Sequence, residues 1–138
     1  MNKLTIQKVE FLAHRLARET MSWDEPIPDF KTRFPGILES CLATPFGTFG
    51  GKDFYKGFIE KAGVLFYLMI KNHPFQNGNK RIAVTSLLTF LSLNKKWLHV
   101  GTQELYRFAV WVAESSADVK EDTIRAIQTF LKKYLKDL

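Results

Sequence analysis

The sequence predicts a single all-α domain, a helical bundle with one small β excursion. Apolar residues recur at helical spacing through most of the chain, whereas glycines and prolines gather in short segments between them. A chain of 138 residues can bury one core and is too short for two ordinary domains, so residues 1–138 should form one domain. The hydrophobic share of 46%, with 14% aromatic residues, is typical of a packed globular protein.

The first helix is expected to run from a Thr5 cap to about Glu19. Its buried stripe should consist of apolar residues at helical spacing: Ile6, Val9, Leu12, Ala13 and Leu16. His14 lies near that stripe without a partner at metal-ligand spacing, so we expect it at the surface or half-buried, with no functional role. Two prolines prevent residues 21–28 from continuing the helix, and this segment should be a loop.

Four further helices are expected: from Lys52 or Asp53 to about Asn72, from Asn79 or Lys80 to Asn94, from Thr102 onward, and from Val119 to Leu135. The segment that ends at Asn72 is apolar around most of its circumference, and Phe54 is among the residues expected to point inward. This segment should therefore lie at the centre of the bundle. A short crossing over residues 95–100 precedes the Thr102 helix.

Composition limits the compartment and the classes of partner. The single cysteine, Cys41, excludes an internal disulfide and fits a small core residue in a reducing compartment. The longest apolar run, residues 63–70, is far shorter than a membrane span, and residues 1–8 lack the apolar stretch of a signal peptide, so we expect a cytoplasmic protein without a membrane partner.

The net charge of +6 makes acidic partners plausible, whether a nucleotide, a nucleic acid or an acidic protein. Lys132, Lys133 and Lys136 are interpreted as a solvated face near the end of the last helix. Nucleic acid is not the expected partner, because the aromatic residues stand mostly at core spacing and are not dispersed along a basic surface.

Residues 44–51 differ in kind from the helical segments. They contain three glycines, one proline, two aromatic residues and no charge, which excludes a helix. One interpretation is a mobile linker. The other is a β-hairpin flap whose exposed edge pairs with an extended stretch of a target protein, formed by Phe46, Gly47, Thr48, Phe49 and Gly50.

Chemistry is concentrated in residues 72–81, between two apolar helices. Pro74 disfavours helical geometry at His73, so the helix before this segment should end near Asn72. Lys80 and Arg81 then open the second helix, where cations oppose the helix dipole and an anion would be held by free backbone N–H groups. Gly78 permits the close approach or positive φ that phosphate-binding loops require, although an ordinary turn with a basic helix start remains an alternative.

The segment His73–Arg81 reads HPFQNGNKR and resembles the signature of the Fic/Doc family, with His, Phe, Asn, Lys and Arg at the family's spacings. The flanking KNHPF and TFLSLNKKW are also similar, so the resemblance extends over roughly the central half of the chain. Lys80 and Val84 stand where Fic proteins carry Gly and a second Arg, which places the sequence nearer the Doc branch. The resemblance implies a Fic-like helical bundle with a β-hairpin flap, preceded by a short helix over residues 33–42.

The resemblance also implies roles for the signature residues. His73 would be the catalytic base, Phe75 the buried anchor of the loop, and Gly78, Asn79, Lys80 and Arg81 the binding site for nucleotide phosphates. Asn77 occupies the position of the acidic residue that holds Mg²⁺ in the family. Because a neutral amide is a weaker Mg²⁺ ligand than a carboxylate, we expect this protein to bind Mg²⁺ more weakly than family members with the acidic residue.

Two chemistries and one non-enzymatic function follow as hypotheses. In the family, Doc transfers the γ-phosphate of ATP to a threonine of elongation factor Tu and stalls translation, whereas Fic proteins transfer AMP to a Ser, Thr or Tyr hydroxyl. The third possibility is a nucleotide- or nucleic-acid-binding module with little turnover. The inhibitory signature of self-inhibited Fic proteins is absent, since Ser116 to Glu121 has the wrong spacing, so the resemblance implies inhibition in trans by a small antitoxin.

Overall fold

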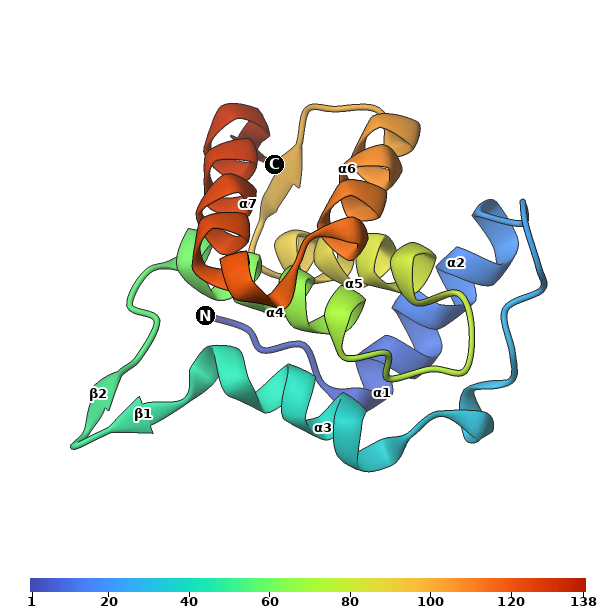
Figure 1. Ribbon diagram of the computed structural model, residues 1–138, viewed down its shortest axis with the longest axis horizontal. Coiled ribbons are helices and arrows are strands. Elements are labelled where there is room, and N and C mark those ends of the chain that lie inside the picture. Colours follow the sequence, from blue (N-terminus) through green and yellow to red (C-terminus); the bar gives the residue numbers. More distant parts are fainter.

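The computed structural model describes residues 1–138 and has two central helices, α4 (Phe58–Lys71) and α5 (Asn79–Leu93), packed against each other (Figure 1). Every residue from Lys61 to Ile70 is buried, which confirms the central position predicted for this segment. The other helices are α1 (Ile6–Lys8), continued by a wide turn over Val9–His14 into α2 (Arg15–Thr20), then α3 (Pro35–Ala43), α6 (Thr102–Glu114) and α7 (Lys120–Tyr134). The fold is all-α with a small hairpin, as predicted.

The outer helices surround α4 and α5. In the view of Figure 1, α6 and α7 stand above the central pair and α3 lies below it, while the first helical stretch runs from below the pair at α1 to the right of α5 at α2. Local sequence explains several boundaries: Pro35 opens α3, where its missing N–H costs nothing, and the last turn of α7 carries Lys132 and Lys133 at its negative end. Both lysines are exposed, as is Lys136, so this cluster is the solvated face that was predicted.

The buried stripe of the first helix agrees only in part with the prediction. Val9 and Ala13 are fully buried as predicted, whereas Leu12 and Leu16 are 48% and 38% exposed. His14 and Ala17 are buried in place of the two leucines. Backbone bonds in the wide turn over Val9–His14 join residues five apart, and the Ala13 carbonyl accepts a hydrogen bond from Thr85 Oγ1 of α5 at 2.8 Å. The small-residue face therefore packs on α5, and the leucines are left at its side.

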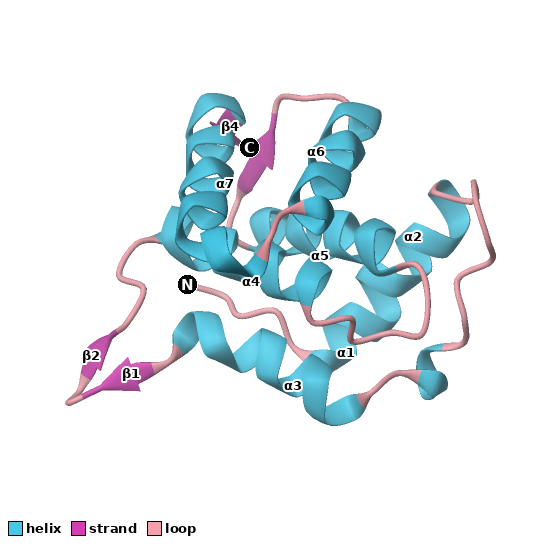
Figure 2. Cartoon of the chain, viewed as in Figure 1, coloured by secondary structure: helices cyan, strands magenta, loops and turns pink.

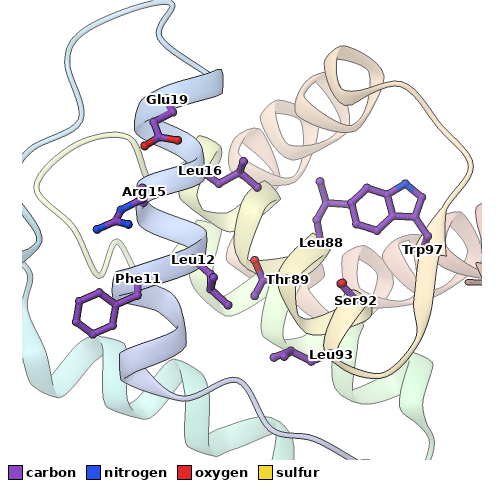
Figure 3. Close-up of a pocket in the computed structure, with 10 residues that line it drawn as sticks. All are labelled: Phe11, Leu12, Arg15, Leu16, Glu19, Leu88, Thr89, Ser92, Leu93 and Trp97. Carbon is purple, nitrogen blue, oxygen red and sulfur yellow. The ribbon is translucent and has the colours of Figure 1, made fainter.

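The displaced leucines line an open hollow of about 500 Å³ between the first helix and the end of α5 (Figure 3). Leu88, Leu93 and Trp97 form its opposite wall. No residue of the segment 72–81 lines this hollow.

His14 is buried, and the expectation of a surface or half-buried position was wrong. Its side chain is 3% exposed, and Nε2 donates to the Pro28 carbonyl at 2.9 Å. The ring packs edge-on against Phe30 at 5.4 Å between centroids. Burial lowers the pKa of His14 below its ordinary value of 6.5.

The segment before α4 forms a hairpin, not the first turns of the helix. Strand β1 (Thr48–Phe49) pairs antiparallel with β2 (Lys52–Asp53), and Gly50 and Gly51 make the turn with φ of 59° and 79° (Figure 2). The predicted helix start at Lys52 or Asp53 was therefore wrong, because two consecutive glycines favour a two-residue turn at this point. The helix starts after Gly57.

The predicted flap limits also change. Phe46 lies outside the hairpin and packs half-buried against Phe90, with ring centroids 6.0 Å apart. Phe49 is 78% exposed, and Phe54, which was expected inside, is 63% exposed. The base of the hairpin is tied to α4 by the buried Lys61, whose Nζ lies 3.1 Å from Asp53 Oδ2.

A second small sheet was not predicted. Strand β3 (Lys96–Leu98) pairs antiparallel with β4 (Leu135–Asp137) after α7, with Trp97 opposite Lys136. Cys41 is fully buried as expected, and burial raises its pKa to about 11. No helix is both long enough and apolar enough to cross a membrane.

Candidate functional site

The loop between α4 and α5 presents His73 to solvent. The α4 helix ends at Lys71, and His73 adopts a left-handed backbone with φ of 50° before Pro74. Positive φ is uncommon for residues other than glycine. The Phe34 N–H donates to the Pro74 carbonyl at 2.9 Å and fixes the loop to the start of α3. His73 thus projects from a constrained turn.

Asn79 holds this turn together from inside. Its Oδ1 accepts from the Phe75 N–H at 2.9 Å, and its Nδ2 donates to the Phe75 carbonyl at 2.8 Å. The same Nδ2 lies 3.5 Å from Nδ1 of His73. Phe75 is 2% exposed and packs near His14 and Phe30. The Asn79 side chain is therefore committed to shaping the loop and to orienting His73.

Gly78 turns the chain into α5 with a φ of 75°. The first backbone bond of the helix runs from the Ile82 N–H to the Gly78 carbonyl at 2.9 Å, which leaves the N–H groups of residues 79–81 without a helical acceptor. Lys80 is half-buried and forms no ion pair. A helix N-terminus with free N–H groups and an unpaired lysine favours an anion.

The side chain of Arg81, expected to contact phosphate, is held instead by carbonyls of another loop. Its Nη2 lies near the start of α5, 3.5 Å from the position of a Cβ added to Gly78. The guanidinium is 2% exposed. It donates to the carbonyls of Met21 and Trp23 from Nη1, at 3.1 and 2.8 Å, and to the carbonyl of Glu25 from Nη2, at 2.7 Å. Three of the five N–H donors of the guanidinium are thus used to hold the loop over residues 21–28, and its other two donors take no part in these bonds.

Asn77 is half-buried, and its Nδ2 donates to Glu25 Oε2 at 3.2 Å. Nowhere in the chain do three or more His, Cys, Asp or Glu side chains gather to hold a metal ion. Mg²⁺ in nucleotide sites needs only one or two protein carboxylates, with phosphates and water as the other ligands. The oxygen atoms of Asn77 and Glu25 fit that donor set.

The hairpin does not lie beside His73. It precedes α4, whereas His73 follows the other end of that helix, and the 14 residues of α4 span about 21 Å. Figure 1 shows the hairpin and the loop over residues 72–78 on opposite sides of the molecule. The structure therefore brings together His73, Asn77, Gly78, Asn79 and Lys80, and separates them from the predicted flap.

Sequence reasoning missed the contribution of residues 21–28. Besides Glu25, this loop supplies Ile27, whose Cγ1 would lie 2.9 Å from a Cβ added to Gly78. The segment shows no periodicity, and its prolines indicate only a loop. The one available signal was Arg81 itself, because an arginine in an apolar helix needs acceptors from elsewhere in the chain.

Comparison with known proteins bears on the family of the chain. The model of the Fic/DOC family matches residues 3–91. The chain is also similar to Toxin Doc of Mycolicibacterium smegmatis (strain ATCC 700084 / mc(2)155), with 36% identity over 66 residues, which are 48% of this chain and 51% of that protein. The alignment thus spans about half the length of this relative. No solved structure gives a significant match. On the match over residues 3–91, the chain belongs to the Fic/DOC family, nearer the Doc branch.

Proposed function

We propose that this protein is a Doc-like toxin, an enzyme that transfers a phosphoryl group from ATP to a hydroxyl group of a protein. The observation that carries the proposal is the position of His73 beside the start of α5, with Asn79 Nδ2 3.5 Å from its ring and Gly78 opening the helix N-terminus. A base and an anion site within a few residues are the two parts that such a transfer requires.

Each residue of the loop has a chemical role in this proposal. The His73 imidazole accepts the proton of the attacking hydroxyl. The free N–H groups of residues 79–81 and the Lys80 ammonium neutralise charge on the phosphate oxygens, where most of the catalysis of phosphoryl transfer arises. Mg²⁺, when bound, neutralises further phosphate charge. The bond between the γ-phosphorus and its bridging oxygen breaks, a bond to the protein oxygen forms, and ADP leaves.

Phosphoryl transfer is favoured over AMP transfer by two positions. Lys80 and Val84 stand where Fic proteins carry Gly and a second Arg, and the similarity to a Doc toxin supports the same choice. By the same resemblance we propose a translation factor such as elongation factor Tu as the target and a small antitoxin as the inhibitor in trans. Adenylylation of a Ser, Thr or Tyr hydroxyl is the alternative chemistry.

The test is incubation of the protein with a cell lysate and ATP labelled at either the α- or the γ-phosphate. Label in a protein band from γ-labelled ATP alone supports phosphoryl transfer, whereas label from α-labelled ATP supports AMP transfer. His73→Ala should abolish the transfer, and His99→Ala, which removes an exposed histidine outside the site, should leave it unchanged. Equal labelling by His73→Ala and wild type would refute the proposal.

A further inference from the structure

The loop over residues 21–28 folds against the signature loop through three separate contacts. Its carbonyls accept hydrogen bonds from Arg81, the Ile27 side chain lies against Gly78, and the Glu25 carboxylate accepts from Asn77. The Arg81 Nη2 bond reaches the Glu25 backbone itself, at 2.7 Å. Arg81 therefore holds the backbone of Glu25 in place, and from this position the Glu25 carboxylate contacts Asn77.

This carboxylate has no cation to balance it. The ion pairs of the protein are Lys61–Asp53, Lys96–Asp137 and Arg125–Asp122, and none of them involves Glu25. The side chain that Glu25 contacts is a neutral amide, one residue before the turn that leads to the proposed phosphate site. A carboxylate at this place repels phosphate oxygens unless a cation lies between them.

We propose that Glu25 supplies the carboxylate ligand for the divalent cation that accompanies the nucleotide, with the Asn77 amide oxygen as a second ligand. The proposal rests on the proposed function, because it assigns the metal of that same site. The amide oxygen of Asn77 turns toward Glu25 by rotation about the Cβ–Cγ bond, which exchanges the two amide atoms. One carboxylate, one amide oxygen, phosphate oxygens and water form a donor set typical of Mg²⁺.

This arrangement explains how the chain can carry an amide at position 77. The charge that the family places in the signature loop would here come from a neighbouring loop, and Arg81 would be the positioning residue that holds it there. Arg81 acts on the site through the backbone of Glu25 and touches neither the cation nor the nucleotide. With Glu25 as a ligand, the affinity for the divalent cation would be higher than Asn77 alone predicts.

The experiment measures the affinity for a non-hydrolysable ATP analogue by calorimetry, with EDTA and with Mn²⁺, in the variant Glu25→Gln. Glutamine keeps an oxygen acceptor for Asn77 Nδ2, so the substitution removes charge and preserves the loop contact. The matched control is Asp24→Asn, which removes the same charge from the adjacent residue. Asn is suited to that position, where φ is 71°. Both variants should unfold at the wild-type temperature.

Glu25→Gln should change affinity in opposite directions in the two conditions. With EDTA it should bind the analogue more tightly than wild type, because a repulsive charge is gone. With Mn²⁺ the Glu25→Gln variant should bind the analogue less tightly than wild type. The gain in affinity that Mn²⁺ causes should fall roughly tenfold, which is the lower end of the losses in metal affinity seen when partners of metal ligands are removed. Asn77→Asp in the Glu25→Gln background should restore the gain, and Asp24→Asn should leave it unchanged.

Three outcomes separate this proposal from the function on which it rests. An unchanged Mn²⁺ effect in Glu25→Gln would overturn the Glu25 assignment while leaving nucleotide binding intact. An equal loss in Asp24→Asn would overturn it as well, because general loop charge would then be the cause. Failure of the wild-type protein to bind the analogue in either condition would overturn the proposed function, and the Glu25 assignment with it.

Discussion

Arg81 offers a direct test of the contacts that hold the candidate site together. Replacement by methionine keeps most of the aliphatic volume and removes three hydrogen bonds from a buried guanidinium to the carbonyls of Met21, Trp23 and Glu25. A hydrogen bond to a charged group contributes about 1.5–3 kcal/mol. We expect a loss of about 3 kcal/mol, below the sum of three bonds, because the carbonyls of a surface loop regain water when the loop opens.

Urea unfolding of Arg81→Met and of wild type measures this loss in the free energy of unfolding. The comparison requires that the free energy of unfolding depends on urea concentration with the same slope in both proteins. The control is Lys80→Ala, which removes the neighbouring positive charge from the same helical turn. Lys80 forms no ion pair, so its replacement should change stability by less than about 0.5 kcal/mol. Hydrogen exchange in Arg81→Met should be accelerated first at residues 21–28.

The result that would refute this reasoning is a loss of less than about 0.5 kcal/mol for Arg81→Met, the size usual for surface substitutions. Such a result, together with a large fall in nucleotide affinity, would return Arg81 to the phosphate-binding role first expected from the sequence. Equal destabilisation by Lys80→Ala would also refute it, because the effect would then belong to helix charge.

Two further predictions concern Gly78 and His14. Gly78→Ala should destabilise the protein by about 1–3 kcal/mol, because alanine is strained at a φ of 75° and its Cβ would lie 2.9 Å from Ile27 Cγ1. Gly36→Ala, whose added Cβ meets nothing within 4 Å, is the control in the same unfolding assay, and an equal cost at both positions would contradict the argument. His14 has a lowered pKa in the folded state, so the unfolded chain binds a proton more readily, and stability should fall as the pH falls below about 6.5. Melting curves of wild type and His14→Gln from neutral to acidic pH check this, and an identical pH dependence would show that His14 does not contribute.

Much of the fold was predictable because its signals are local. The apolar residues around the circumference of α4, the helical spacing in α5 and the helix break before Pro74 are patterns of neighbouring residues. The structure shows the buried helix, the second helix and the break between them that these patterns predict. The burial of Cys41 and the exposure of the C-terminal lysines followed from the same kind of pattern. Periodicity works where one face of a helix meets one surface.

The errors arose where distant residues decide the local structure. The first helix buries His14 and Ala17 where Leu12 and Leu16 were expected. Its contact with α5 includes the hydrogen bond from Thr85 to the Ala13 carbonyl, a partner that no local pattern reveals. Strand β3 forms because the chain returns after α7 to pair with it, across a long sequence separation. The role of Arg81 likewise depends on acceptors in residues 21–28.

The most direct test of the proposed nucleotide site is the change in the amide resonances of the protein during titration with ATP. We expect the largest shifts at residues 79–81, whose N–H groups lack helical acceptors, and a roughly tenfold weaker affinity in Lys80→Ala, as the loss of one charged hydrogen bond implies. Largest shifts around the apolar hollow at Leu16 and Trp97, or unchanged affinity in Lys80→Ala, would contradict a phosphate site at the start of α5.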